Sequence, residues 1–191
     1  MTFADQQRIS IENLEVTASG SEETLCFSAT VLLDNEPIAC ASNQGQGDLT
    51  CIYPLQGRGM GEKFSEAEEF AKSLEMDSAD NRGLERVSRE MGFTSALNYL
   101  VDTLVEQQCI NKKVQEMFRR DMKTMLLFFK GRRLLFVKGV KPESIVDKPA
   151  YYNALRELQG REIVILDELP EDEAFQRWKN QAIDIDECSG S

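Results

Sequence analysis

The sequence predicts an α+β fold: an N-terminal antiparallel β-meander packed on a helix, a central helical segment, and a C-terminal β-hairpin and βαβ element. Three observations support this prediction. In residues 25–33, the apolar Leu25, Phe27, Ala29, Val31 and Leu33 alternate with Cys26, Ser28, Thr30 and Leu32, as in a half-buried strand. Between residues 97 and 122 the apolar side chains recur at helical spacing. After residue 125 the period becomes that of strands, on either side of the tight turn Lys130-Gly131-Arg132-Arg133.

The N-terminal meander is expected to contain four strands, at residues 9–16, 25–33, 38–42 and 50–53. The sequence Asp34-Asn35-Glu36-Pro37 between the second and third strands consists of residues that favour turns. A glycine loop at residues 43–48 leads to the fourth strand. Because the connections are short, consecutive strands should pair antiparallel.

Helices are expected after this meander. A second glycine loop at residues 56–62 precedes a helix that Ser65 can cap, with Glu68 at the capping-box spacing. Residues 76–93 are polar and predict a linker or short helix. Thr94 then caps the central helix, for which a break near Asn111 is allowed.

The C-terminal part is expected to be mixed. Strand 134–137, helix 151–158, which ends at Gly160, and strand 162–166 would form the βαβ element. One or two amphipathic turns follow around Phe175 and Trp178. We therefore divide the chain into residues 1–75, the linker 76–93, residues 94–180 and a flexible acidic tail at 181–191, which can all belong to one compact domain.

Composition narrows the class of function. The chain has no histidine, which is the commonest general base and zinc ligand. Its five cysteines include no CxxC pair, so most should be free, with Cys26 and Cys40 buried in strands. No apolar run approaches the roughly 20 residues of a membrane span, and no signal peptide is visible. We expect a cytoplasmic protein that uses no cofactor or metal and does not associate with membranes.

Charge is distributed unevenly along the chain. Residues 112–141 carry ten basic and two acidic residues, a balance of +8, whereas the whole chain carries −11. Attraction between acidic ends and basic middle is one explanation, and an anionic partner is the other. Phe128, Phe129 and Phe136 lie among the basic residues, as stacking surfaces for nucleic acid would. The candidate residues for binding a partner or nucleic acid are Arg119, Arg120, Lys123, Lys130, Arg132 and Arg133.

The first glycine loop is a second candidate site. Its backbone N–H groups can bind an anion, although glycine also serves simply to form turns. The residues proposed for a small ligand are Asn43, Gly45, Gly47, Asp48 and Tyr53. Residues 163–168 resemble a Walker B strand, but the chain lacks the GxxxxGK[ST] loop that nucleotide hydrolysis requires. The carboxylates at residues 184–187 lack the glycine of a calcium loop and indicate a solvated tail.

Residues 21–34 (SEETLCFSATVLLD), followed by Asn43-Gln44-Gly45-Gln46-Gly47 and Tyr53, resemble the opening of uncharacterised small proteins of phages, prophages and plasmids. The similarity covers about the first 75 residues, although a more glycine-rich loop is expected in that group. The resemblance implies a mobile-element accessory protein and transfers no catalytic residue.

The leading hypothesis is a non-enzymatic phage or mobile-element accessory protein. It would bind a host macromolecule, in the first place a host protein, and inhibit a bacterial defence or regulatory system. Nucleic-acid binding through the basic residues and small-ligand or nucleotide binding through the glycine loops are the alternatives. The sequence leaves the oligomeric state open, a homodimer included.

Overall fold

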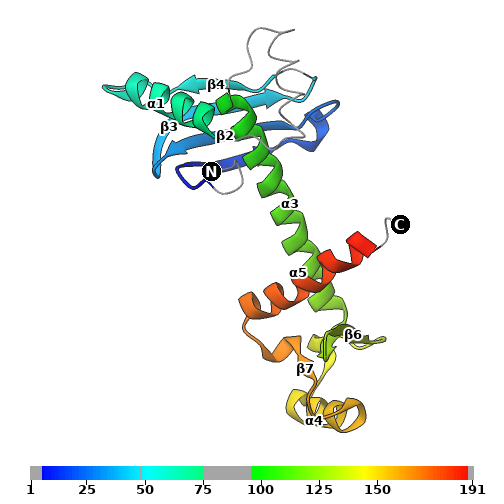
Figure 1. The fold of residues 1–191 in the computed structure, drawn as a ribbon. Coiled ribbons are helices and arrows are strands. Elements are labelled where there is room, and N and C mark those ends of the chain that lie inside the picture. Colours follow the sequence, from blue (N-terminus) through cyan, green and yellow to red (C-terminus); the bar gives the residue numbers. More distant parts are fainter. Residues whose placement is uncertain (1–5, 48, 75–95, 189–191) are drawn as a thin grey trace. The chain divides into compact units, whose positions relative to one another are not determined.

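A computed structural model of the chain describes residues 6–47, 49–74 and 96–188. The chain divides into two compact units, residues 1–109 and residues 110–191. Most of their helices and strands are labelled in Figure 1. The predicted linker at residues 76–93 and the predicted cap at Thr94 lie outside the described residues.

The N-terminal unit contains a four-stranded antiparallel sheet in the order β1-β2-β3-β4. Its strands are β1 (Ile9–Val16), β2 (Cys26–Leu33), β3 (Glu36–Gln44) and β4 (Cys51–Pro54). Asp34 and Asn35 join β2 to β3 with φ angles of +50° and +67°, the left-handed conformation that a tight hairpin requires. The predicted meander and its turn are confirmed.

Helices cover one face of this sheet and form the N-terminal core with it (Figure 1). The helix α1 (Met60–Ser73) buries Ala67 and Ala71, whose small side chains allow close packing on β3 and β4. The first part of α3 (Ala96–Thr124) adds fully buried leucines and valines, such as Leu97 and Val101, to the same cluster. The predicted packing of the meander on a helix is confirmed.

The start of α1 differs from the prediction. The helix begins at Met60, directly after Gly59, whose φ of +78° turns the chain into the helix. Ser65 is therefore an exposed residue inside the helix and does not cap its N-terminus. Glycine can supply this left-handed entry without a side chain, which is why the capping-box pattern at Ser65 is not used.

The other face of the N-terminal sheet is polar. Cys40 lies opposite Thr30 on β2 and opposite Tyr53 on β4, and it is exposed. Cys26 is half-buried on the same face. The prediction that these two cysteines are buried is wrong, because side chains alternate along a strand and neighbours such as Ala41 take the core positions.

The helix α3 is continuous from Ala96 to Thr124, so the break allowed near Asn111 does not occur. The segment contains no glycine or proline that would kink it. Leu97 belongs to the N-terminal core, whereas Phe118 belongs to a cluster of the C-terminal unit. The division between the units consequently falls inside this helix, after Cys109, which differs from the boundaries expected from the sequence.

The C-terminal unit contains a three-stranded sheet in the order β6-β5-β7. Strand β5 (Leu126–Lys130) pairs antiparallel with β6 (Arg133–Val137) and with β7 (Val164–Ile165). The predicted hairpin is confirmed. Because β5 is antiparallel to both neighbours, β6 and β7 are parallel to each other but separated by β5. The βαβ element thus takes a split form, and its last strand is shorter than predicted because residues Leu166–Glu168 form a 3₁₀ helix.

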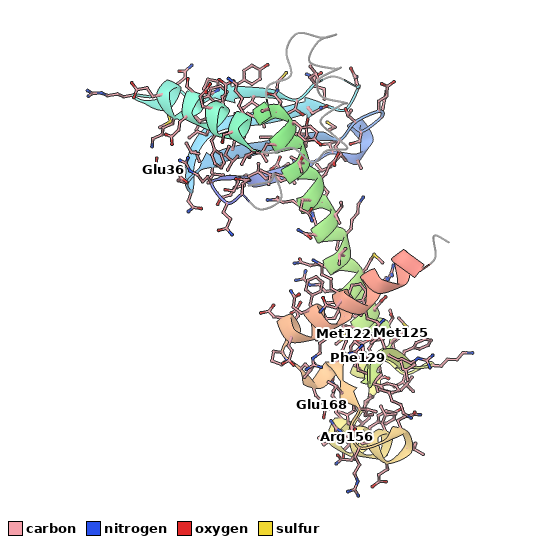
Figure 2. The ribbon with its side chains drawn as sticks, in the orientation of Figure 1. Glu36, Met122, Met125, Phe129, Arg156 and Glu168 are labelled. Atoms are coloured by element: carbon pink, nitrogen blue, oxygen red, sulfur yellow. The ribbon has the colours of Figure 1, made fainter. Side chains whose placement is uncertain are left out.

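Both faces of the C-terminal sheet are covered. On one face, Leu127 and Phe129 pack with Phe118 of α3 and Trp178 of α5 (Glu171–Cys188). Met122 and Met125 pack at the edge of this cluster, and Figure 2 shows them beside Phe129. On the other face, a second cluster joins the sheet to α4 (Lys148–Gln159); its buried members are Leu126, Phe128, Tyr152, Leu155, Ile163 and Ile165.

The ends of α4 follow the sequence rules. The Asp147 carboxylate accepts a hydrogen bond from the Ala150 N–H at 3.0 Å, and Gly160 ends the helix as predicted. An ion pair between Arg156 and Glu168 ties α4 to the 3₁₀ segment (Figure 2). The helix α5 is longer than the one or two turns predicted. Among the described residues, no helix combines the length and apolar character needed to cross a membrane.

Candidate functional site

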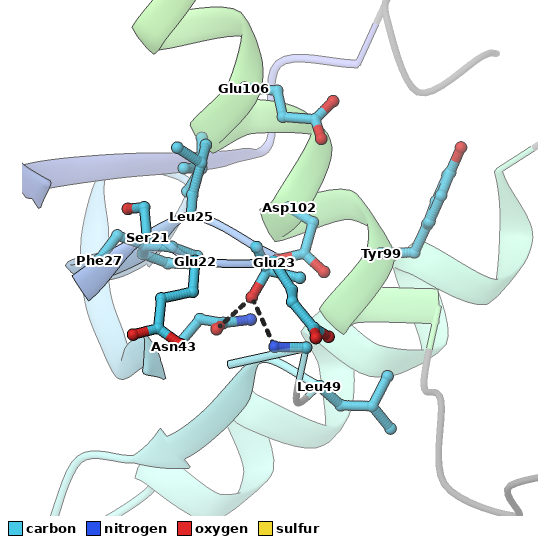
Figure 3. Close-up of a pocket in the computed structure, with 13 residues that line it drawn as sticks. Ser21, Glu22, Glu23, Leu25, Phe27, Asn43, Leu49, Tyr99, Asp102 and Glu106 are labelled. Atoms are coloured by element: carbon cyan, nitrogen blue, oxygen red, sulfur yellow. Dashed lines mark hydrogen bonds between the residues drawn. The ribbon is translucent and has the colours of Figure 1, made fainter. Parts of the chain in front are cut away.

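A cavity of about 630 Å³ lies in the N-terminal unit (Figure 3). Its walls come from the connection between β1 and β2, from the end of β3 and the loop after it, and from α3. Apolar side chains and carboxylates share the lining. The lining residues are Ser21, Glu22, Glu23, Thr24, Leu25, Phe27, Asn43, Gly47, Leu49, Tyr99, Asp102, Val105 and Glu106.

Backbone contacts hold two of these wall segments together. The N–H groups of Glu22, Glu23 and Thr24 all donate to the Gly45 carbonyl oxygen, at 2.9 to 3.3 Å. Gly45 has a φ of +83°, and a Cβ built there would lie 2.0 Å from the Gly20 carbonyl oxygen. A side chain is excluded at this position, so the approach of the two segments depends on glycine.

Asn43 organises the side chains beneath the cavity. Its Oδ1 accepts from the Thr24 hydroxyl at 3.0 Å and from the Gly45 N–H at 2.8 Å. Its Nδ2 donates to Thr50 Oγ1 at 3.2 Å. Thr24 Oγ1 accepts from the Gly47 N–H at 3.4 Å, and the bonds between lining residues are dashed in Figure 3. Asn43 is buried, so these bonds replace the water that its amide loses.

The same network reaches α3. The Thr50 hydroxyl donates to Asp102 Oδ1 at 2.5 Å, and Asn98 Nδ2 donates to the Thr50 carbonyl oxygen at 2.5 Å. Burial raises the pKa of Asp102 above its usual value, Glu106 adds to this effect, and the bond from Thr50 opposes it. The helix is thereby attached to the loop after β3, and a partly desolvated carboxylate is held in the cavity wall.

The electrostatic character of the cavity is acidic. Four carboxylates line it, and the described lining includes no lysine or arginine. In Figure 3, Glu22 and Glu23 come from the strand connection, whereas Asp102 and Glu106 come from α3. Within the described part of the chain, no group of three or more Asp, Glu, Cys or His residues is arranged to hold a metal ion. The four carboxylates, together with apolar side chains such as Leu25, Phe27 and Val105, suit an organic cation with an apolar portion.

The predicted ligand loop contributes two of its residues to this cavity. Asn43 and Gly47 line it, and Gly45 lies directly beside them. The N–H groups of Gly45 and Gly47 already donate to Asn43 and to Thr24, which disfavours their use for an anion. Asp48 lies outside the described residues. Tyr53 is exposed on β4 and does not line the cavity, and the neighbouring Cys51 thiol raises the pKa of its hydroxyl.

The residues that give the cavity its charge were not predicted. Tyr99, Asp102 and Glu106 follow the helical spacing that places side chains on one face of α3. This spacing could have predicted that the three side chains share a face of the helix. No sequence pattern near Glu22 and Glu23 indicates that these two residues line the same cavity.

The predicted basic site is divided between two places in the C-terminal unit. Arg119, Arg120 and Lys123 lie near the end of α3, where Arg119 pairs with Glu171 at 3.2 Å and Arg120 with Asp121 at 3.3 Å. Lys130, Arg132 and Arg133 lie at the turn between β5 and β6. Strand β5, about 13 Å long over its four residue steps, lies between the two groups along the chain.

The aromatic residues among these charges also separate. Phe128 and Phe129 are buried on opposite faces of the sheet, and Phe136 is 57% exposed on β6. Arg119 and Lys123 border a second cavity of about 430 Å³, together with Asp167 and Glu171. Of these three phenylalanines, Phe136 on β6 is therefore the exposed one.

The Walker-like acidic residues have structural partners. Asp167 accepts hydrogen bonds from Lys148 Nζ at 2.6 Å and from the Tyr152 hydroxyl at 2.5 Å. Burial and the bond to Asp167 raise the pKa of Tyr152. Glu168 pairs with Arg156. These contacts attach α4 to the 3₁₀ helix, so both carboxylates have protein partners.

The comparisons with family models, curated proteins and solved structures find no match for this chain.

Proposed function

We propose that this protein is a binding protein and that its N-terminal cavity receives a lysine or arginine side chain of a host protein. The observation that carries the proposal is the cavity of about 630 Å³, lined by four carboxylates and by no described cation. Its size is in the range of cavities that hold small ligands or anchoring side chains.

The lining matches both ends of a basic side chain. Leu25, Phe27 and Val105 provide apolar surface for the methylene stem, and the carboxylates Asp102 and Glu106 can receive the charged end. Because Asp102 is partly desolvated, a cation placed beside it would form a stronger bond than one at the open surface. The network through Thr50 holds this carboxylate before the partner arrives.

The net charge of the N-terminal unit also favours a basic partner. Residues 1–109 contain 7 basic and 19 acidic residues, which gives 7 − 19 = −12. A field of this sign would attract a basic partner and increase its association rate at low salt. The phage-like N-terminal segment suggests a bacterial host protein as the partner, and inhibition of a defence or regulatory system as the consequence of binding.

A fluorescent lysine hexapeptide provides a direct test by anisotropy. The double variant Glu22→Gln/Glu106→Gln removes two charges from the cavity, and Glu12→Gln/Glu15→Gln removes two exposed charges from β1 as the matched control. We expect the cavity variant to weaken binding about tenfold and the control to change it less than twofold. Equal losses of affinity in both variants would show that peptide binding depends on the net charge of the protein and not on the cavity, and the proposal would then be wrong.

A second measurement distinguishes a protein partner from a small cation. The wild-type protein and both variants are used to capture partners from nuclease-treated bacterial lysate, and spermidine is tested in parallel by thermal shift. A captured protein that is lost with the cavity variant and kept with the control supports the proposal. Stabilisation by spermidine without such a protein would assign the cavity to a free polyamine.

A further inference from the structure

Strand β6, one of the two outer strands of the C-terminal sheet, has an unpaired edge. Within the described residues, β6 pairs with β5 and with no other strand. In an antiparallel pair of strands, hydrogen-bonded and non-hydrogen-bonded residue pairs alternate. Lys130 and Arg133, on either side of the two-residue turn, form the first hydrogen-bonded pair. Leu134 and Phe136 therefore direct their N–H and C=O groups away from β5. An extended chain could pair with these groups.

The edge is held in place by the packing of β6. Leu134 packs into the cluster that contains Phe118 and Trp178, and Leu135 packs into the cluster on the opposite face. Since both faces are anchored, the strand would lose little conformational freedom on pairing with another chain. Phe136, by contrast, is 57% exposed and offers an apolar contact in the middle of the edge.

The charges at this edge have one sign. Arg133 begins β6, Lys138 follows it directly, and Lys130 and Arg132 lie at the turn. None of the ion pairs between described residues involves these four side chains; the pairs of the basic segment belong to Arg119 and Arg120. An incoming strand with acidic residues would therefore meet uncompensated positive charge.

Other occupants fit less well. If two copies paired antiparallel through β6, Arg133 of one copy would approach the Val137 and Lys138 end of the other, and like charges would repel. Nucleic acid would find one exposed aromatic side chain here, and its backbone lacks the alternating N–H and C=O groups that pair with a strand edge. The charge pattern favours an acidic polypeptide.

We propose that the free edge of β6 binds an extended acidic segment of a partner protein by strand addition. An apolar residue of that segment would pack on Phe136, and its acidic residues would lie near Arg133 and Lys138. This mode of recognition uses main-chain hydrogen bonds for affinity and alternate side chains for specificity. The site lies within the C-terminal unit, so it does not depend on the function proposed for the N-terminal cavity.

The test uses a fluorescent octapeptide of alternating glutamate and valine, with a lysine–valine octapeptide and a dT oligonucleotide as competitors for the same surface. We expect Arg133→Glu/Lys138→Glu to weaken binding of the acidic peptide about tenfold. The control Lys113→Glu/Arg161→Glu makes the same charge change at exposed positions away from β6 and should have little effect. Phe136→Pro should bind more weakly than Phe136→Ala, because both lose the ring but proline also lacks the outward N–H.

Amide hydrogen exchange of the wild-type protein tests the geometry without a variant. The acidic peptide should slow exchange at Leu134 and Phe136 specifically. Absence of peptide binding at millimolar concentration, equal binding of the lysine peptide, or unchanged exchange at these amides would overturn the proposal. Tighter binding of the oligonucleotide would assign the edge to nucleic acid instead. Emission of Trp178 confirms that each variant keeps its C-terminal cluster.

Discussion

Replacement of Asn43 by alanine should destabilise the N-terminal unit substantially. Among the described residues, the side chain makes hydrogen bonds with Thr24, Gly45 and Thr50 at 2.8 to 3.2 Å, three in number, and it is buried. Each buried bond contributes about 1 kcal/mol, so their loss should lower the free energy of unfolding by about 3 kcal/mol. A role limited to ligand binding would predict almost no change in stability.

Urea unfolding followed by far-ultraviolet circular dichroism measures this loss. Gln44→Ala is the matched control, because Gln44 is the next residue of β3, carries the same amide group and is exposed. An exposed substitution of this kind should change stability by less than about 0.5 kcal/mol. A loss below about 1 kcal/mol for Asn43→Ala would refute the reasoning that this amide holds the cavity loops together.

Three further substitutions test other parts of the structure. Phe118→Ala should cost about 3–5 kcal/mol, read from Trp178 emission in urea, because Phe118 is 3% exposed and its ring lies 5.6 Å from that of Trp178. Gly45→Ala should cost several times the roughly 1 kcal/mol expected for Gly131→Ala in calorimetry, because both have positive φ but only Gly45 faces a backbone atom. Asp102→Asn should raise the free energy of unfolding at pH values above the raised pKa of Asp102, because ionising this carboxylate is harder in the folded state than in the unfolded state. This gain should vanish at pH values below the usual aspartate pKa, where the carboxyl is protonated in both states. A gain in urea unfolding that grows as the pH falls would contradict that account.

The elements with a clear period were predictable from the sequence. In β2, Phe27, Ala29 and Val31 are buried and Ser28 between them is exposed, because one covered face of a sheet imposes alternation. The hairpin at Gly131 was predictable because a two-residue turn separates two apolar runs. The start of α1 was not, because the left-handed Gly59 determines it and the sequence also offers a plausible cap at Ser65.

The candidate sites were harder to predict because they are assembled from distant segments. Glu22 and Asp102 are about 80 residues apart, and no local pattern indicates that they face one cavity. Conversely, Arg119 and Arg132 belong to one basic segment of the sequence, but Arg119 lies in α3 and Arg132 in the turn after β5. Proximity in the sequence therefore does not indicate which of these side chains share a surface.

The polar outer face of the N-terminal sheet also determines which thiols of this protein can be labelled or oxidised. Cys40 and Cys51 are free and exposed there, whereas Cys26 and Cys109 are half-buried. Phe27 and Asn43, which line the cavity, belong to the opposite face. A maleimide dye or a biotin coupled at Cys40 or Cys51 would thus leave the cavity open. Storage without reductant, by the same geometry, would favour covalent dimers joined through these thiols.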